Sequence, residues 1–203
     1  MASMFHQSSR TLQDRFDTRR IADRIESRLV KDEIDDGKRS FIESVDMFFL
    51  ATADEQGLPS CSYKGGAPGF VRVVDAHTIA FPNYDGNGMY LSMGNVARNP
   101  HVGLLFIDFE RGSRMRLNGT ASIDDADPLM AEYPESQFIV RVRVREVFPN
   151  CPRYVHKMKR VEASPFVPQV GMETPVPAWK RSEWASDAIS DADPARDPSR
   201  PAR

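Results

Sequence analysis

The chain has 203 residues, a formal net charge of −2 and 40% hydrophobic residues. This length suits one domain with extensions, and the hydrophobic content can form a buried core, which excludes a wholly disordered chain. The near-neutral charge argues against a nucleic-acid surface, and no apolar stretch is long enough to span a membrane. The first residues also lack the basic and apolar regions of a secretory signal. We therefore expect a cytoplasmic protein that binds a small-molecule substrate, with neither nucleic acid nor membrane as a partner.

Residues 1–36 are predicted to form an N-terminal helical extension. Apolar residues recur there with the spacing of an amphipathic helix, namely Leu12, Phe16, Ile21, Ile25 and Leu29. The charged stretch DEIDDG, which contains a glycine, marks a break before a short helix around residues 38–45. We expect the main domain to cover residues 37–150.

From Met47 onward the pattern is typical of strands. MFFLATA and LPSCSYK are predicted to form a hairpin around DEQG, with Gly57 at a position that needs a positive φ. FVRVVD and TIAFP form a second pair. HVGLLFIDF is apolar on both alternating faces, which is typical of a strand covered on both sides, whereas MRLNGTASI and IVRVRVREV alternate apolar and polar residues.

These segments predict six or so antiparallel strands, interrupted by one helix at about residues 88–98. A closed or nearly closed barrel is the simplest arrangement, because it leaves few exposed strand edges. We expect residues 151–186 to pack on the barrel or on a dimer partner. Residues 187–203 are rich in proline and charge, and we expect them to be disordered.

Some residues are better explained by structure than by chemistry. Met89 and Met93 lie four apart and are predicted to pack the helix on the barrel. Cys61 and Cys151 are expected to be free thiols, because disulfides are rare in the cytosol. Cys151 and His156 have no further ligands at a suitable spacing, so we predict no metal site.

The last strand carries a basic stripe formed by Arg141, Arg143 and Arg145, which Arg116 can extend from a neighbouring strand. We interpret the stripe as a solvated or interface face of the sheet, since charged residues usually occupy the exposed half of an alternating strand. Contact with an anionic substrate is the less favoured alternative.

The stretch NYDGNG, residues 83–88, combines a turn with the expected start of the helix. Gly86 and Gly88 let the backbone approach a ligand closely, and free N–H groups at a helix start favour an anion. Asn87 can donate from its amide, and Lys64 in YKGG can supply positive charge. On its own such a turn is more often only a turn, so this prediction depends on the strands around it.

Residues 57–120 resemble the flavin-binding split barrel of the pyridoxamine 5'-phosphate oxidase superfamily, most closely its branch of predicted flavin-nucleotide-binding proteins. The similarity is carried by YKGGAPGF, AFPNYDGN, the GN...NP helix, VGLLF and RLNGTA, and extends weakly to NCPRY and PAWK. It implies a mainly β fold, a six-stranded antiparallel split β-barrel with flanking helices. It also implies a homodimer with flavin mononucleotide (FMN) across the interface, which agrees with the doubly apolar strand.

The resemblance also indicates which residues hold the cofactor. The oxidases carry an arginine where this chain has Ser62, and an arginine–lysine pair where it has Asn87 and Gly88. We therefore expect the backbone and Lys64 to hold the phosphate here. The predicted cofactor-binding residues are Ser62, Tyr63, Lys64, Gly65, Gly66, Asn83, Tyr84, Asp85, Asn87, Tyr90 and Arg116.

The implied activity is an FMN-dependent oxidoreductase that passes electrons between reduced nicotinamide, or a small organic substrate, and the flavin. A flavin carries the redox chemistry itself, so no catalytic side chain is assigned. Two alternatives stay open: deazaflavin or haem in the same groove, and a flavin-binding protein without turnover. Pyridoxamine phosphate oxidase activity is not expected, because PVPAWKRSEWASD lacks a recognisable arginine and histidine motif for that substrate.

Overall fold

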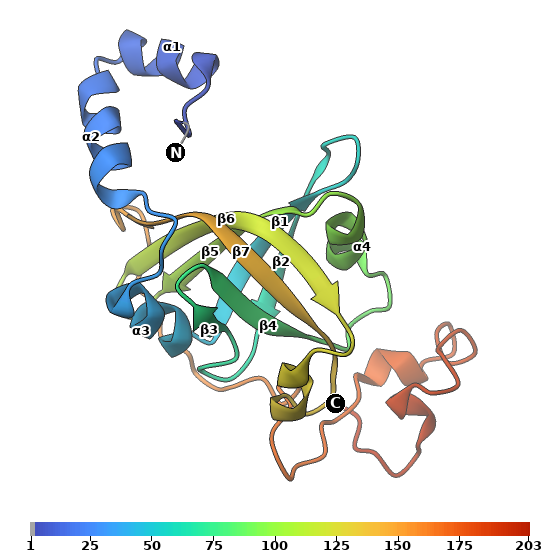
Figure 1. Ribbon diagram of the computed structural model, residues 1–203. Helices are drawn as coiled ribbons and strands as arrows, with labels where there is room; N and C mark the ends of the chain where they lie inside the picture. Colours follow the sequence, from blue (N-terminus) through green and yellow to red (C-terminus); the bar gives the residue numbers. More distant parts are fainter. Residues whose placement is uncertain (1–2) are drawn as a thin grey trace.

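The computed structural model describes residues 3–203 (Figure 1). Its centre is one antiparallel sheet of seven strands in the order β2-β1-β5-β6-β7-β4-β3. The strands are β1 (Met47–Ala53), β2 (Pro59–Gly65), β3 (Arg72–Asp75), β4 (Thr78–Tyr84), β5 (His101–Asp108), β6 (Ser113–Asp124) and β7 (Ser136–Asn150). The sheet curls around one core, so the predicted antiparallel barrel is confirmed. The short β3 makes the sheet one strand larger than the predicted six-stranded barrel.

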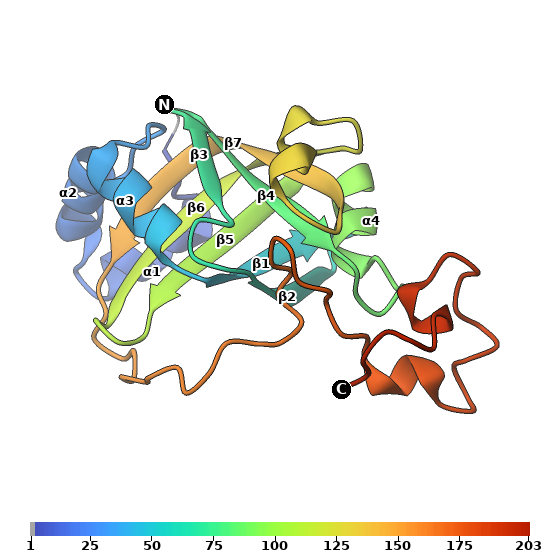
Figure 2. The same cartoon turned by 90° about the horizontal axis from the view of Figure 1, so that it is seen from below.

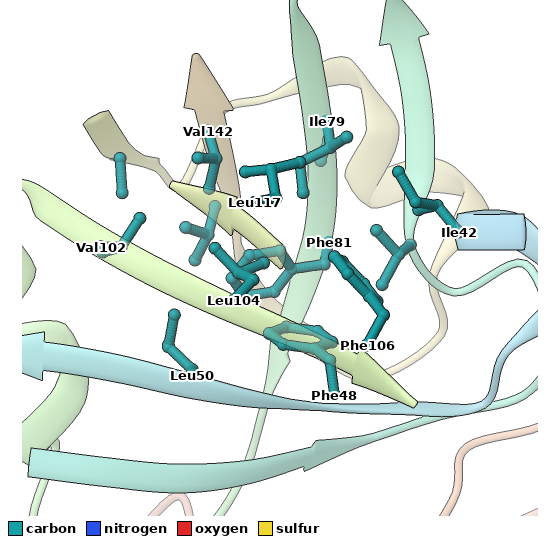
Figure 3. Packing of buried hydrophobic residues seen from close by; sticks show 14 of the residues in the cluster. Ile42, Phe48, Leu50, Ile79, Phe81, Val102, Leu104, Phe106, Leu117 and Val142 are labelled. Atoms are coloured by element: carbon teal, nitrogen blue, oxygen red, sulfur yellow. The ribbon is translucent and has the colours of Figure 1, made fainter. Parts of the chain in front are cut away.

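Phenylalanine rings from several strands meet at the centre of the core (Figure 3). Phe48 is 0% exposed, and its ring centroid lies 5.0 Å from that of Phe81 and 5.3 Å from that of Phe106. Leu104 and Leu117 lie in the same core, as the predicted alternation of apolar and polar residues requires for Leu117. Burial of such side chains is the main favourable contribution to folding, at about 1.5–3 kcal/mol each.

Two helices, not one, form the N-terminal extension. They are α1 (Gln7–Arg15) and α2 (Arg19–Leu29). The predicted single helix is interrupted because Asp17 adopts a φ of 52°, a left-handed conformation that ends α1. The two helices lie away from the barrel (Figure 1), and none of their residues is buried. The predicted apolar face, which includes Phe16, is therefore exposed in the described chain.

The short helix α3 (Asp36–Ser44) begins where Asp35 accepts a hydrogen bond from the backbone of Lys38. It is the helix that the sequence predicts around residues 38–45, and it buries Ile42 against the core. The helix that interrupts the strands is α4 (Leu91–Arg98), which lies between β4 and β5 in the chain.

The β1–β2 hairpin turns at Gly57, whose φ of 82° confirms the predicted positive value. Its register pairs Leu50 with Ser62 and Phe48 with Lys64. Directly paired residues in neighbouring strands share a face of the sheet. Ser62 and Lys64 therefore continue the core face outward onto the edge strand β2.

After β7 the chain runs along the barrel and then forms a C-terminal lobe, residues 166–203 (Figure 2). On the way, Met158 donates a backbone hydrogen bond of 3.2 Å to Phe109. The lobe contains two 3-10 turns, η2 (Ala178–Arg181) and η3 (Pro194–Arg196).

Residues 187–203 differ from the disorder expected of them. They return to the start of the lobe, where Ala202 forms a β-bridge with Val176, and Asp193 pairs with Lys180. These contacts join distant positions, so composition alone does not reveal them. The boundaries of the extension, barrel and C-terminal segments stay predictions.

Candidate functional site

A pocket of about 370 Å³ lies between β2 and the start of α4. Ser62 and Lys64 line it from β2, Asn83 and Tyr84 from the end of β4, and the turn at residues 86–90 encloses it. Small-molecule sites in proteins usually measure about 300–1,000 Å³. The fold thus brings together predicted site residues from separate parts of the sequence.

Hydrogen bonds fix α4 against the sheet beside this pocket. The hydroxyl oxygens of Ser62 and Ser92 lie 3.0 Å apart, and the amide nitrogen of Asn95 donates to the hydroxyl of Thr52 at 3.0 Å. Ser92 and Thr52 are buried, so these bonds satisfy groups that would otherwise be costly to remove from water. The amino end of α4 is therefore held at the pocket.

The helix α4 begins at Leu91, three residues later than the sequence predicts. The delay has a conformational cause, since Gly88 and Tyr90 have positive φ values of 75° and 49°. Tyr90 makes no side-chain hydrogen bond to the helix, and Asn87 accepts one from the backbone of Met89 at 3.1 Å within the turn. The first backbone N–H groups of α4 thus stay available to an anion.

The later start of α4 also separates the two methionines. Met93 is buried, as predicted for core packing. Met89 lies before the helix and is 62% exposed, so the prediction that it packs in the core is wrong.

Lys64 supplies the positive charge of the pocket. It is half-buried, and its ammonium group has no hydrogen-bond or ion-pair partner within residues 3–203. Burial lowers the pKa of Lys64 from its ordinary value, because the charged form loses water. Among the described residues that line this pocket there is no Asp or Glu. Ammonium, hydroxyl and N–H donors without a competing carboxylate fit a phosphate group.

The opposite wall of the pocket contains an amide and a phenol. Asn83 is buried and its side-chain nitrogen donates to the Gln137 side chain at 2.9 Å. Burial raises the pKa of Tyr84 to about 12, with a smaller effect of Tyr133, so its hydroxyl can donate a hydrogen bond at neutral pH. Sequence reasoning missed Gln137 and Ser92, and neither stands in a pattern that marks it.

Three predicted residues on and after β2 do not reach the pocket. Tyr63 points from the other face of β2 and is 62% exposed. A Cβ added at Gly65 would press on the Tyr63 ring, and one added at Gly66 would clash with the ring of Phe70. The two glycines therefore allow close packing and do not line the site.

Arg116 and Asp85 also lie apart from the smaller pocket. Arg116 stands on β6, paired with Leu105, on the outer face of the sheet. The Asp85 carboxylate lies 2.5 Å from the ammonium of Lys180, which also lies 2.8 Å from Asp193. The Lys180 side chain is only 4% exposed; burial lowers its pKa, but the hydrogen bonds to Asp193 and Asp85 outweigh this and raise it.

A larger pocket of about 1030 Å³ adjoins the smaller one. Its walls come from the turn after β4 and from the C-terminal lobe, including Trp179 and Trp184. Tyr84, Asn87 and Tyr90 line both pockets. Sequence reasoning also missed Trp179, Trp184 and Lys180; the weak resemblance at PAWK gave a signal for Trp179 and Lys180 only.

The remaining sequence features do not add to the site. Arg141 pairs with the buried carboxylate of Asp127, while Arg143 and Arg145 are exposed, which agrees with the favoured interpretation of the basic stripe.

Within residues 3–203, no His, Cys, Asp and Glu side chains form a group that could hold a metal ion, and no helix is long and apolar enough to cross a membrane.

Comparison of the sequence with profiles of known protein families finds one family that matches most of the chain. The sequence profile described as Pyridoxamine 5'-phosphate oxidase matches residues 34–162, which contain the whole barrel. No curated protein matches the chain.

Several solved structures are similar in fold. An FMN-binding protein from Syntrophomonas wolfei has 12% identity and a TM-score of 0.43, over 70% of this chain and 97% of that chain. A candidate pyridoxamine 5'-phosphate oxidase from Lactobacillus delbrueckii has 21% identity and a TM-score of 0.48, over 58% and 95%. HutZ, the heme storage protein from Vibrio cholerae, has 17% identity and a TM-score of 0.41, over 57% and 94%.

Proposed function

Because the chain belongs to the pyridoxamine 5'-phosphate oxidase family, we propose that it is a flavoprotein that binds FMN between β2 and α4 and uses it in oxidoreduction. The observation that carries this proposal is the half-buried ammonium of Lys64, which has no partner among the described residues and shares a pocket with the uncapped amino end of α4. An unpaired charge away from water is costly, and an anionic ligand would remove that cost.

The phosphate of FMN would bind to Lys64 and to the first N–H groups of α4. Charge-assisted hydrogen bonds of this kind are about twice as strong as neutral ones, and the helix dipole adds to them. The glycines of the turn support this placement, since a Cβ added at Gly86 or Gly88 would meet no atom within 4 Å. A ligand can therefore approach the turn backbone closely.

The rest of the cofactor would lie along Asn83, Tyr84 and Tyr90. The protonated Tyr84 hydroxyl can donate a hydrogen bond to an oxygen or nitrogen of the ligand. When bound, FMN supplies the electron-transfer chemistry, and these residues hold and orient it. No histidine lines either pocket within residues 3–203, which favours flavin over a histidine-ligated haem.

We also propose a homodimer through the outer face of the sheet. The register places Tyr63, Phe49 and Leu105 side by side on β2, β1 and β5, and the rings of Tyr63 and Phe49 have centroids 6.1 Å apart. A contiguous apolar face on a sheet is typical of an interface. Arg116 stands in the same row of the sheet, so it would reach a cofactor only from the partner subunit.

The absorbance spectrum of protein purified without added cofactor tests the proposal. We expect flavin bands, with up to one FMN per subunit, and quenching of the fluorescence of added FMN by the cofactor-free protein. A haem or deazaflavin spectrum would show that another cofactor takes the place of FMN. A colourless protein that does not quench the fluorescence of added FMN would refute flavin binding.

Turnover needs a separate measurement. Under anaerobic conditions, reduced nicotinamide should bleach the bound flavin if the protein is the proposed oxidoreductase. If the flavin stays oxidised with both reduced nicotinamides and with small organic donors, the protein binds flavin but is not the proposed oxidoreductase.

A further inference from the structure

We propose that the larger pocket is a substrate site for a planar, uncharged aromatic molecule. Its role as a substrate site rests on the proposed function, because the substrate would exchange electrons with the FMN bound beside it. The proposal depends on three features of the pocket: its aromatic wall, the pairing of its charges and its position.

The aromatic wall contains two tryptophans from the C-terminal lobe. The rings of Trp179 and Trp184 are stacked, with centroids 5.6 Å apart and planes inclined by 13°. Both are exposed, Trp184 to 74%, although tryptophan is usually well covered in folded proteins. Phe166 lines the same pocket. A flat, accessible aromatic surface inside a hollow favours a flat aromatic ligand, which can stack on it.

The charged side chains of this pocket are all paired, and together they leave one excess negative charge. Lys180 lies between Asp85 and Asp193, and Arg200 lies 3.4 Å from Glu135. Every charged residue that lines the pocket, within the part of the chain that the structure describes, has such a partner. An anionic ligand would meet the excess negative charge, and a cationic ligand would compete with Lys180 and Arg200 for their carboxylates, whereas an uncharged ring would leave the pairs intact. The smaller pocket differs, because its Lys64 has no partner there.

The position of the pocket is suited to a substrate. The turn that encloses the smaller pocket also forms a wall of the larger one, through Tyr84, Asn87 and Tyr90. The ion pair between Asp85 and Lys180 holds the C-terminal lobe against this turn. A ring bound against the tryptophans would therefore lie next to a cofactor in the smaller pocket.

The two tryptophans are the only ones in the chain, so tryptophan fluorescence reports on this pocket alone. The probe is menadione, an uncharged naphthoquinone, and its matched control is a naphthoquinone sulfonate with the same ring system and a negative charge. Isothermal titration calorimetry provides a second readout that does not depend on tryptophan. We expect saturable quenching and binding heat with menadione, and affinity at least about tenfold lower for the sulfonate, a factor equal to 1.4 kcal/mol.

Variants locate the binding. Trp184→Ala should weaken menadione binding by about tenfold or more by calorimetry, the range for loss of an aromatic contact. Trp184→Phe should largely retain it, which separates stacking from a folding defect. Phe16→Ala, which removes an exposed ring in the N-terminal extension, should leave it unchanged. Equal affinity for menadione and the sulfonate, or unchanged binding by Trp184→Ala, would overturn the proposal.

FMN titrations of the same variants distinguish the two hypotheses. Trp184→Ala should bind FMN normally, because Trp184 lies outside the smaller pocket. If menadione binds and FMN does not, the aromatic site stands and the proposed function fails. If FMN binds and menadione does not, the proposed function stands and this inference fails.

Discussion

The hydroxyl groups of Ser62 and Ser92, 3.0 Å apart, join the edge strand β2 to the first turn of α4. Lys64 lies two residues along the same strand, and alternate residues of a strand share a face. The contact therefore brings the lysine and the amino end of the helix to the same pocket. Neither group would form a strong anion site alone, because one is a single charge and the other a set of partial charges.

The affinity for FMN should depend on pH through Lys64. Burial lowers the pKa of this lysine, whereas a bound phosphate stabilises its ammonium form, so FMN binding and protonation of Lys64 favour each other. Affinity should thus fall as pH rises through the lowered pKa. It should also fall below about pH 6, where a phosphate monoester takes up its second proton. Fluorescence titrations across this range would measure both effects.

Riboflavin and Lys64→Ala are the controls for this pH profile. Riboflavin has no phosphate, so the acid decrease should be absent. Lys64→Ala should lose the alkaline decrease that is due to the lysine. The folding stability of the protein without ligand should change with pH in the opposite direction. Lys64 has a lower pKa in the folded than in the unfolded chain, so the unfolded chain binds this proton more tightly. The free energy of unfolding therefore rises as pH increases from the lowered pKa to the ordinary one. An identical pH profile in Lys64→Ala would contradict the assignment.

Two glycine substitutions should separate packing from ligand binding. Gly66→Ala places a methyl group against Phe70, whose ring stacks on Phe48 with centroids 5.8 Å apart, and should lower the free energy of unfolding by about 1–3 kcal/mol. The methyl group of Gly86→Ala would meet no atom, so this variant should keep that free energy nearly unchanged while it weakens FMN binding. Urea unfolding and FMN titration of both variants test this. A Gly66→Ala protein of unchanged stability would show that Phe70 moves aside freely.

The core of the barrel depends on Phe48. This side chain is fully buried among other rings, so Phe48→Ala should lower the free energy of unfolding by about 3–5 kcal/mol, the usual cost of such a cavity. Phe16→Ala removes the same ring from an exposed position and should change stability by less than about 0.5 kcal/mol. Comparable losses in the two variants, measured by urea unfolding, would mean that Phe16 is covered in solution, for example by a second subunit.

The strands could be predicted because their signals are local. Alternation indicated which residues of β6 and β7 face the core, and Gly57 marked the first hairpin turn, whereas β5 was predicted to be apolar on both faces. The start of α4 could not be placed in the same way. Gly88 and Tyr90 adopt positive φ values, and for Tyr90 nothing in its own chemistry favours that conformation. The positive φ of Asp17 likewise interrupts the expected N-terminal helix.

The site was predictable only where it uses one strand or one turn. Lys64 and Asn87 stand in recognisable stretches, and the fold brings them together. The pair formed by Asp85 and Lys180 joins positions 95 residues apart, and no period in the sequence connects them. Asp85 was therefore assigned to the cofactor, although its carboxylate contacts the C-terminal lobe.

The C-terminal lobe should depend on Asp193. Its carboxylate is largely buried beside the ammonium of Lys180, so Asp193→Asn weakens a charged hydrogen bond and should cost the lobe about 1–3 kcal/mol of local stability. Hydrogen exchange should become faster in residues 166–203, while exchange in the barrel stays unchanged. Asp191→Asn is the control, since Asp191 is fully exposed. Equal exchange in the two variants would argue against the buried pair.

Truncation after Asp187 removes Asp193 together with the rest of the tail. The barrel core contains no residue beyond Val147, so the truncated chain should fold, form the proposed dimer and bind FMN. Loss of FMN binding would instead mean that the lobe is needed to hold the turn at residues 84–90.

The most direct measurement compares the affinities of Lys64→Ala and the unchanged protein for FMN and riboflavin. If Lys64 holds the phosphate, FMN binding should weaken by about 1.5–3 kcal/mol, roughly 10- to 150-fold, with riboflavin nearly unaffected. The loss should become smaller as salt rises, because screening weakens the interaction of a partly exposed charge. Lys31→Ala, at the end of the N-terminal helices, should bind both ligands normally. Equal weakening of FMN and riboflavin by Lys64→Ala, or no weakening of either, would contradict the proposed phosphate site.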